Sequence, residues 1–520
     1  MNFENPVIRG MYPDPSLVQV DGVWYLVNST FEYFPGIPIF RSRDLVNWEQ
    51  IGNIALDPHA LGLCDAPASS GIFAVTIRFH EGRFYIITTA FGRKCLRNFI
   101  MTAEHPEGPW SAPVFVPVDG IDPSLYWEDG KTYVQFTSFG QISQAVIDET
   151  TGQILEGPKA LTCGCGGRDA EGPHIFRKGA YYYLLLAEGG TKDGHMVTMM
   201  RARNIWGPYE ASPFLPVISA VNHAREPLQC IGHADLAETP SGRTYLVCLG
   251  TRPLENKSLL GRETVLSEVE WTKDGWLRGK EPFVPLAGET EFPGEQHLPA
   301  ERVWNSEDPL PLWMLSLREN PKAFLQRRGE RTFLVGNGHG TQEEVPFACA
   351  LIRQSDFAFR FTAELSPVPE SREAGCAGVI LYADPVHQIS LSLSGDTLQA
   401  ERVYYDLKEI RRWKTKASRA RFTVTGDRDG YHLFLLPLAE DGSTDEAELS
   451  RLAAQGLAAN TTDGAEVLSS TWKLLSAYNT DSQNTGVTMG IFASGEIQAE
   501  VHSFRYKREK DIVKQISFFK

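Results

Sequence analysis

One pattern recurs five times in the first half of the chain and limits its fold more than any other feature. Each copy is an apolar run, a turn that contains glycine, and an aromatic-rich run. The copies follow one another about every 50 to 60 residues, with turn glycines at Gly22, Gly82, Gly130, Gly179 and Gly242. Asp-Gly or Glu-Gly between such runs is a strong signal for a β-hairpin. Hairpins at this spacing are typical of the four-stranded blades of a propeller, so the sequence predicts a five-bladed β-propeller, with an open β-sandwich meander as the alternative.

The pattern of the chain changes after residue 285. Residues 286–311 are rich in Pro, Gly and Glu and are predicted to form a linker. From residue 312 to 520, alternating segments such as FAFRFTAEL and QISLSLSG predict an antiparallel β-sandwich. The expected fold is therefore all-β, with a propeller domain over residues 1–285 and a sandwich domain over residues 312–520.

The composition excludes some classes of partner. The net charge of −15 argues against nucleic-acid or anionic-membrane binding, which depends on clustered Lys and Arg, and favours a neutral substrate. No apolar run of about 18 residues occurs, and the first residues lack the pattern of a secretion signal. Eight cysteines in so long a chain do not suggest a disulfide framework. We expect a cytoplasmic protein with reduced thiols; homo-oligomer formation is left open.

Three acidic residues fall at one place in the repeat. Counting back eight residues from the turn glycine gives Asp14, Asp122 and Glu171, whereas the second copy gives Ala74 and the fifth, with its longer turn, gives His233. Equivalent positions near the first strand of each blade surround the propeller axis, so the three carboxylates are predicted to converge. Because burying like charges together is unfavourable, their convergence favours a functional site.

Two prolines flank the first of these acids. Pro13 and Pro15 stiffen the chain on both sides of Asp14, and Pro15 predicts extended geometry for it. The carboxylate of Asp14 is therefore expected to have a defined direction, toward the shared site.

Convergent carboxylates could bind Ca²⁺ or carry out acid/base chemistry on a neutral substrate. A metal site would prefer further oxygen ligands, but the second and fifth copies offer Ala74 and His233. Glycoside hydrolysis uses two carboxyl groups with separated pKa values, and is favoured. No cofactor is expected to be required, and a Ca²⁺ on the propeller axis or a metal on His233 is left open. Phe31 and Phe73 could form an apolar wall for a sugar ring or belong to the core.

Several motifs in order carry a family resemblance over about the first 280 residues: NPVIRGMYPDPS, STFEYFPGIPIFRSRDLVNW, GIDPSLYWEDGKTY, AEGPHIF, AEGGT, CIGHADL and LGRET. Together they resemble glycoside hydrolase family 43, in its β-xylosidase and α-L-arabinofuranosidase branch. The second half resembles the concanavalin-like C-terminal domain of many β-xylosidases of that family.

The resemblance implies a five-bladed propeller and an inverting hydrolysis. By it, Asp14 is similar to the general base, Glu171 to the general acid, and Asp122 to the carboxylate that orients the acid and tunes its pKa. Further residues resemble substrate-binding positions, with Phe31 as a wall of the −1 subsite: Phe31, Phe73, Thr191, His233 and Arg262. Many relatives have Trp-Ala-Pro where this chain has Phe73-Ala74-Val75, which predicts a thinner pocket wall.

The expected function is therefore exo-acting, inverting release of terminal β-D-xylose from xylo-oligosaccharides. The alternative is an α-L-arabinofuranosidase, or a bifunctional enzyme, acting on arabinoxylan fragments. Rival classes are a retaining fructosyl hydrolase and a non-catalytic sugar-binding propeller. His233 as a core histidine and Arg262 in a surface ion pair with Glu263 are the structural alternatives for those residues.

A loop of the second domain bears on specificity. In relatives, a sandwich loop similar to Gly-Ala-Phe-Val-Gly brings an aromatic residue to the rim of the pocket. The corresponding stretch here, residues 486–490, has Thr488 and no Phe, with Tyr478 upstream as a substitute. The sequence predicts a wider +1 side that tolerates arabinose-decorated ends.

Overall fold

The structure is a computed structural model that describes the chain except for residues 256, 477–483 and 510–520. The chain divides into two compact units. The propeller unit contains Met1–Leu298, Leu317–Asn320 and, among the described residues, 484–486. The sandwich unit contains Pro299–Ser316 and the described residues of 321–476 and 487–509.

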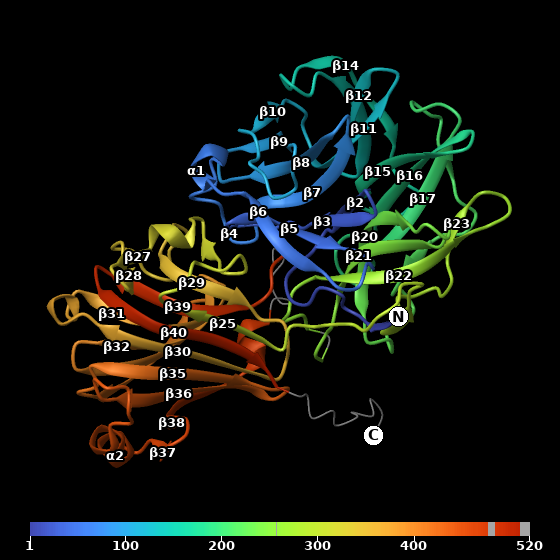
Figure 1. Ribbon diagram of the computed structural model, residues 1–520. Helices are drawn as coiled ribbons and strands as arrows, with labels where there is room; N and C mark the ends of the chain where they lie inside the picture. The colour runs from blue at the N-terminus through green and yellow to red at the C-terminus, as the bar shows by residue number, and fades with distance from the viewer. Residues whose placement is uncertain (256, 477–483, 510–520) are drawn as a thin grey trace. The chain divides into compact units, whose positions relative to one another are not determined.

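The propeller unit contains five antiparallel sheets, the blades of a five-bladed propeller, drawn from blue to yellow-green in Figure 1. Blade 1 is β2 (Ser16–Val20), β3 (Val23–Val27), β5 (Gly36–Ser42) and β6 (Glu49–Ala55). Blade 2 is β7 (Gly71–His80), β8 (Arg83–Phe91), β9 (Leu96–Ala103) and β10 (Val114–Val116). Blade 3 is β11 (Ile121–Glu128), β12 (Lys131–Ser138), β13 (Gln141–Ile147) and β14 (Ile154–Thr162).

The last two blades follow the same antiparallel order. Blade 4 is β15 (Glu171–Lys178), β16 (Tyr181–Glu188), β17 (Met196–Ala202) and β18 (Glu210–Ala211), with β19 (Ile218–Ser219) also paired to β17. Blade 5 is β20 (Gln229–Glu238), β21 (Thr244–Thr251), β22 (Glu263–Trp271) and β23 (Leu277–Gly279). The short elements of the unit are β1 (Asn2–Glu4), which pairs with β24 (Ala287–Glu289), β4 (Tyr33–Phe34) and α1 (Pro58–Leu61). All five predicted hairpins are confirmed as the first two strands of the blades.

Apolar side chains from neighbouring blades pack between the sheets and hold them together. One cluster joins Val27 and Ile39 of blade 1 to Ile77 and Ile86 of blade 2, all fully buried. Burial of such alternating β-branched and aliphatic residues is the main stabilising contribution to stacked sheets. This apolar core therefore lies between neighbouring blades.

The register of blade 4 corrects the predicted alignment of the three acids. The first paired residue of β11 is Ile121 and that of β15 is Glu171, and each is followed by a β-bulge. Glu171 therefore corresponds to Ile121, and Gly172 corresponds to Asp122. The prediction that all three acids occupy one position is wrong for Glu171, which lies one residue earlier.

The hairpin turn explains this one-residue shift. Lys178 pairs with Tyr181, so Gly179 is the first of two turn residues. In blade 3, Glu128 pairs with Lys131, so Gly130 is the second. Counting back from the glycine therefore gives different positions in the two blades.

The sandwich unit has two antiparallel sheets, drawn from yellow to red in Figure 1. The larger sheet contains β25 (Glu301–Asn305), β27 (Leu325–Arg328), β28 (Arg331–Val335), β30 (Phe359–Pro367), β35 (Arg419–Gly426), β36 (Gly430–Leu438), β37 (Ala458–Asn460), β38 (Gly464–Thr471) and β40 (Gln498–Arg508). The smaller sheet contains β29 (Ala348–Arg353), β31 (Gly375–Asp384), β32 (His387–Ser394), β33 (Thr397–Tyr404), β34 (Leu407–Lys414) and β39 (Thr488–Gly495). The only α-helix that the described part of this unit contains is α2 (Glu446–Ala454). Alternating burial along β30 is typical of a sandwich strand with one face on the core.

The stretch predicted as a linker, residues 286–311, contains two strands. β24 pairs with β1 in the propeller unit, and β25 pairs with β40 in the sandwich unit. The Pro- and Gly-rich composition hid both strands, because each is short and half exposed. Among the residues that the structure describes, no helix has both the length and the apolar character needed to span a bilayer.

Candidate active site

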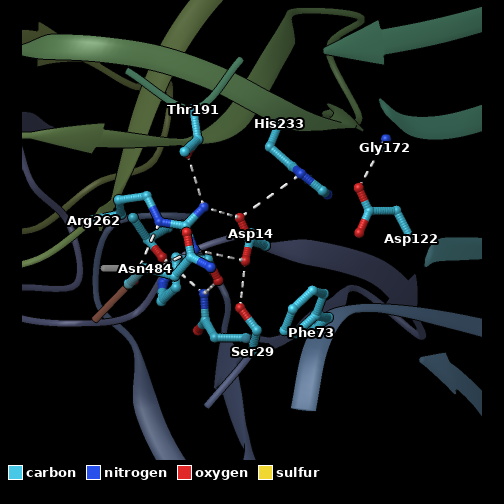
Figure 2. Close-up of polar contacts among 12 residues, drawn as sticks. Asp14, Ser29, Phe73, Asp122, Gly172, Thr191, His233, Arg262 and Asn484 are labelled. Atoms are coloured by element: carbon cyan, nitrogen blue, oxygen red, sulfur yellow. Dashed lines mark hydrogen bonds and ion pairs between the residues drawn. The ribbon is translucent and has the colours of Figure 1, made fainter. Parts of the chain in front are cut away.

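Asp14 is a buried carboxylate surrounded by hydrogen-bond donors and positive charge. Arg262 Nη1 donates to Oδ1 at 3.0 Å and Nη2 to Oδ2 at 3.5 Å, while the Ser29 hydroxyl donates to Oδ2. His233 Nδ1 lies 3.7 Å from Oδ1. Figure 2 shows these side chains converging on Asp14 from different parts of the propeller unit. Burial raises the pKa of Asp14, but Arg262, His233 and Ser29 outweigh that effect, so its pKa is lowered from the ordinary value.

The backbone at the start of four inner strands is left-handed. Asp14, Asp122, Gly172 and His233 have φ of 52°, 53°, 56° and 47°. The extended geometry predicted for Asp14 from Pro15 is therefore wrong. Aspartate and histidine tolerate this region better than most residues do. The shared conformation turns the side chains of Asp14, Asp122 and His233 out of their strands in the same way.

Asp122 and Glu171 form the second part of the site. Asp122 is buried, and its Oδ2 accepts the backbone N–H of Gly172 at 3.2 Å, as Figure 2 shows. Burial raises the pKa of Asp122, and the negative charge of Asp14 adds to this. Burial is also the largest cause that raises the pKa of Glu171 well above its ordinary value, followed by the charges of Asp122 and Asp14. One site thus holds one carboxyl whose pKa is lowered and two whose pKa values are raised.

Arg262 connects Asp14 to three other parts of the propeller unit. Its Nη1 donates to the Thr191 hydroxyl at 3.1 Å, its Nε and Nη2 to the Asn484 carbonyl at 3.4 Å, and its Cζ lies 5.4 Å from the centre of the Phe31 ring. The alternative of a surface ion pair with Glu263 is wrong.

Glu263, the next residue, has a different partner. It is fully buried and accepts two hydrogen bonds from Arg252, at 2.7 and 2.9 Å. Its other contact is with the backbone N–H of Gly10 at 2.6 Å. This pair fixes the chain next to Arg262 and leaves the Arg262 guanidinium directed at Asp14.

The two predicted aromatic residues lie on one side of the site. The Phe31 and Phe73 rings are 5.6 Å apart, and Phe73 and Phe91 are 5.3 Å apart. Phe31 is almost fully buried, whereas Phe73 is half-buried and Phe91 exposed. Phe31 thus packs beneath Arg262, and Phe73 offers more of its ring to solvent. Contacts or charge coupling link all eight predicted site residues into one cluster.

Three members of the cluster were not predicted: Ser29, His195 and Asn484. Ser29 is the first residue of the motif STFEYFPGIPIFRSRDLVNW, but the sequence analysis assigned a role in that motif only to Phe31. Asn484 lies 222 positions from Arg262 along the chain, and its backbone N–H also binds the Ser69 hydroxyl at 3.0 Å. No local sequence pattern predicts the contact of Asn484 with Arg262 or with Ser69.

His195 is the most unusual of the three. It is fully buried, and neither ring nitrogen has a hydrogen-bond partner of good geometry in the described part of the chain. Burial, with the charges of His233 and Arg262, lowers its pKa to about 3, so the ring is neutral. A Cβ on Gly232 would lie 2.0 Å from His195 Cδ2, so the glycine beside His233 makes room for this ring.

The stretch predicted as a rim loop has a different structure. Thr488 begins strand β39, is fully buried, and donates to the Tyr382 carbonyl at 3.3 Å. The prediction of a loop at 486–490 is therefore wrong for residues 488–490, because Thr488 is in sheet pairing with Tyr382 and Arg353, whereas residues 486 and 487 precede the strand. Tyr478 lies outside the described residues.

Hydrogen-bond donors engage the carboxylate at the centre of the site. The acidic oxygens of Asp14 accept from Arg262 and Ser29, and His233 Nδ1 faces the same carboxylate. Outside residues 256, 477–483 and 510–520, no group of three or more His, Cys, Asp or Glu side chains is arranged to hold a metal. The carboxylate oxygens of Asp14, which are the kind of ligand that a hard cation such as Ca²⁺ prefers, are thus engaged by N–H and O–H donors.

Both halves of the chain match known family models. Residues 3–277 match glycosyl hydrolases family 43, and residues 313–507 match the beta xylosidase C-terminal concanavalin A-like domain. The chain belongs to glycosyl hydrolase family 43. The family resemblance of the motifs is confirmed, as is the pairing of a propeller with a concanavalin-like domain.

Relatives in this family have related but different names. The chain is 45% identical over 287 residues to a non-reducing end alpha-L-arabinofuranosidase of Bacteroides ovatus. That alignment covers 54% of this chain and 54% of the relative, about half of each. A xylosidase/arabinosidase of Butyrivibrio fibrisolvens is 34% identical over 419 residues, which cover 74% of this chain and 79% of the relative. The crystal structure of a xylan beta-1,4-xylosidase from Bacillus halodurans is similar with a TM-score of 0.86 and 27% identity, covering 97% of this chain and all of that one.

Proposed function

We propose that this family 43 protein is an exo-acting, inverting glycosidase that removes a terminal pentose from oligosaccharides. The observation that carries the proposal is the opposite perturbation of two carboxyls in one site. The pKa of Asp14 is lowered and the pKa of Glu171 is raised well above its ordinary value. Pairs of carboxyls separated in this way provide a base and an acid at the same pH.

Asp14 is proposed as the general base. Its carboxylate takes a proton from a water molecule while the water oxygen forms a bond to the anomeric carbon. Arg262 and Ser29 keep Asp14 ionised, but they also stabilise its charge and so limit its basicity. Their second effect is to fix the direction of the carboxylate, which proton transfer requires.

Glu171 is proposed as the general acid. The carboxyl gives its proton to the glycosidic oxygen as the bond between that oxygen and the anomeric carbon breaks. The anomeric configuration inverts because water enters from the face opposite to the leaving group. Asp122 is proposed as the residue that keeps Glu171 protonated, because its negative charge raises the pKa of Glu171.

The proposed substrates are xylo-oligosaccharides with terminal β-D-xylose, and secondly arabinoxylan fragments with terminal α-L-arabinofuranose. The names of the relatives support both sugars, since one is a xylosidase/arabinosidase and another an alpha-L-arabinofuranosidase. The half-buried Phe73 ring, beside Phe31, supports a sugar-stacking wall. The proposed acid/base steps need no cofactor.

A panel of aryl glycosides tests the proposal. Wild-type protein is expected to hydrolyse an aryl β-D-xyloside, an aryl α-L-arabinofuranoside or both, and Asp14→Ala is expected to lose activity on each. NMR of the first-formed sugar is expected to show the inverted anomer. Release of the retained anomer would support a retaining hydrolase instead, and binding without turnover would support a sugar-binding propeller.

A further inference from the structure

The innermost strands carry a second group of polar residues, two positions after the left-handed residue in four blades and two positions after Ala74 in blade 2. Counted from the turn, each lies on the fifth pair of its hairpin ladder in blades 1 to 4 and on the fourth pair in blade 5, and all are buried: Ser16, Thr76, Ser124, His174 and Asp235. Such positions in a β-core are usually apolar. Thr76 and Ser124 donate to the Pro123 carbonyl and to Gln135. Ser16, His174 and Asp235 instead contact one charged group.

That charged group is Arg78, which reaches this level from β7 of blade 2. Its Nη1 donates to Asp235 Oδ2 at 2.8 Å and to Ser16 Oγ at 3.2 Å, and its Nη2 lies 2.8 Å from His174 Nδ1. The Ser16 hydroxyl also donates to Asp235 at 2.7 Å. One guanidinium therefore connects the inner strands of blades 1, 2, 4 and 5.

The charges at this level are balanced. Burial raises the pKa of Asp235, but the charge and hydrogen bond of Arg78, with the hydrogen bond from Ser16, outweigh it, so Asp235 is ionised against the guanidinium. Burial lowers the pKa of His174 to about 3, and the charge of Arg78 contributes, so its Nδ1 accepts a hydrogen bond as a neutral imidazole. The acceptors that a metal ion would use at this level are thus engaged by Arg78.

This level lies close in sequence to the proposed catalytic residues. Ser16 follows Asp14 by two positions, His174 follows Glu171 by three, and Asp235 follows His233 by two. Arg78 therefore contacts each of these three inner strands within three residues of the side chain that the strand contributes to the site.

We propose that Arg78 is a built-in cation that takes the place of an axial metal ion and positions the strands bearing Asp14, Glu171 and His233. Arg78 touches none of these three residues in the described structure, so it is a positioning residue. The planar geometry of the guanidinium matters as much as its charge, because its N–H groups must reach three acceptors in three other blades at once.

The test compares Arg78→Ala and Arg78→Lys with the control Arg83→Ala. Arg83 is in the same blade, is half exposed and pairs with the exposed Glu104. Arg78→Ala is expected to lower the melting temperature by roughly 10 °C, because Asp235 is left buried without its partner. Its kcat on an aryl glycoside, measured well below that melting temperature, is expected to fall on the order of 10²-fold, with KM changed much less. Arg83→Ala is expected to match wild type in both measurements.

Chemical rescue separates positioning from general destabilisation. The Arg78 side chain is 18% exposed, so a small solute can enter the space that alanine leaves. Guanidinium at concentrations too low to denature is expected to raise both kcat and the melting temperature of Arg78→Ala, whereas urea at the same concentrations is not. Arg78→Lys, which keeps the charge and loses the planar geometry, is expected to give intermediate kcat. If Arg78→Ala does not fold, the kcat of Arg78→Lys is the test: a value below that of wild type supports the inference, and a wild-type value contradicts it.

Three results would overturn the inference. They are a folded Arg78 variant with wild-type kcat, rescue by urea equal to that by guanidinium, and a wild-type melting temperature that falls with a chelator or rises with Ca²⁺. The kcat readout rests on the proposed function, but the melting temperatures do not. Wild-type protein that hydrolyses no glycoside would therefore reject the proposed function while the thermal measurements still test Arg78.

Discussion

Arg262 sets the protonation state of Asp14 through direct contact. A buried carboxylate normally resists ionisation, since burial penalises the charged form. Two hydrogen bonds from one guanidinium, and a third from Ser29, reverse that tendency at Asp14. No cation of the described chain is hydrogen-bonded to Glu171, and burial, together with the charges of Asp122 and Asp14, raises its pKa. The different neighbours of two carboxyl side chains thus shift their pKa values in opposite directions, as the proposed base and acid require.

The role of Glu171 can be tested with leaving groups of different basicity. Glu171→Ala is expected to reduce turnover of xylobiose by about 10²- to 10⁴-fold, because its departing oxygen needs a proton. On an aryl glycoside with an acidic phenol, the loss is expected to be much smaller. Steady-state kcat/KM on both substrates measures the difference, and equal losses would contradict the assignment.

The role of Asp122 can be tested with a pH profile. Asp122→Asn removes a negative charge that raises the pKa of Glu171, so the pKa of Glu171 is expected to fall. Activity needs Glu171 protonated, so the basic limb of kcat/KM is expected to move to lower pH while the acidic limb, set by Asp14, moves less. Glu128→Gln, on the same strand and paired with the exposed Arg177, is the matched control. A basic limb unchanged from wild type would remove Asp122 from this role.

Sequence reasoning found the site residues that lie in contiguous motifs. Asp14, Thr191 and Arg262 each belong to a short distinctive stretch, and the structure joins them by hydrogen bonds. His195 and Asn484 were missed for physical reasons. A single histidine gives no signal until its burial is known, and a contact across 222 positions cannot be seen in a local pattern.

The start of the inner strand is the element that all five blades reuse. A left-handed residue begins it in four of them, and in blade 4 that residue is Gly172. A Cβ there would lie 3.0 Å from Cε1 of His233, so a side chain would meet the neighbouring blade's histidine. Glycine is needed at this point both for its conformation and for the close approach.

Gly172→Ala tests this element against a matched glycine. Both Gly172 and Gly130 are left-handed, so alanine is expected to cost roughly 1–2 kcal/mol of unfolding free energy at either position. Gly130 has no atom within 4 Å of the added Cβ, so Gly130→Ala is expected to keep full activity. Gly172→Ala is expected to lose more than 10-fold in kcat/KM as well, because His233 must move. Urea denaturation and kinetics on both variants measure this, and equal activity of the two would contradict the steric argument.

The hairpins could be predicted from the sequence because their signals are local. The register of the paired strands could not be predicted in the same way. Acid-Gly turns and alternating apolar residues fix each hairpin within a few residues. Whether the glycine is first or second in the turn depends on strand pairing, and this placed Glu171 one residue off. Strands β24 and β25 were missed because their partners, β1 and β40, lie far away in the chain.

The propeller unit is completed by two stretches that come after its main segment. Arg318 is fully buried, and its Nε donates to the Ala66 carbonyl at 2.6 Å while its backbone N–H donates to the Glu32 carbonyl at 2.7 Å. Asn484 binds Ser69 and Arg262 from the other stretch. Residues 317–320 and 484–486 therefore belong to the propeller unit because of their contacts, although they follow its main segment in the sequence.

A truncated chain tests this dependence. Residues 1–298 alone contain all five blades but lack Arg318 and Asn484. We expect this fragment to have a lower melting temperature than the full chain and little hydrolysis, because the Ala66 and Glu32 carbonyls and Arg262 lose buried partners. Co-expression of residues 299–520 as a separate chain is expected to restore part of the activity. A fragment with full activity would show that the two stretches are dispensable.

The contact between Asn484 and Arg262 also determines when the site can be completed during translation. Residues up to 298 leave the ribosome long before residue 484 of the 520 has been made. The five blades can pair as they emerge, but Arg262 acquires its Asn484 carbonyl only after residue 484 has been made. A message that stops early in the second half would therefore yield a chain with Asp14, Asp122 and Glu171 in place and with Arg262 lacking one of its hydrogen-bond partners.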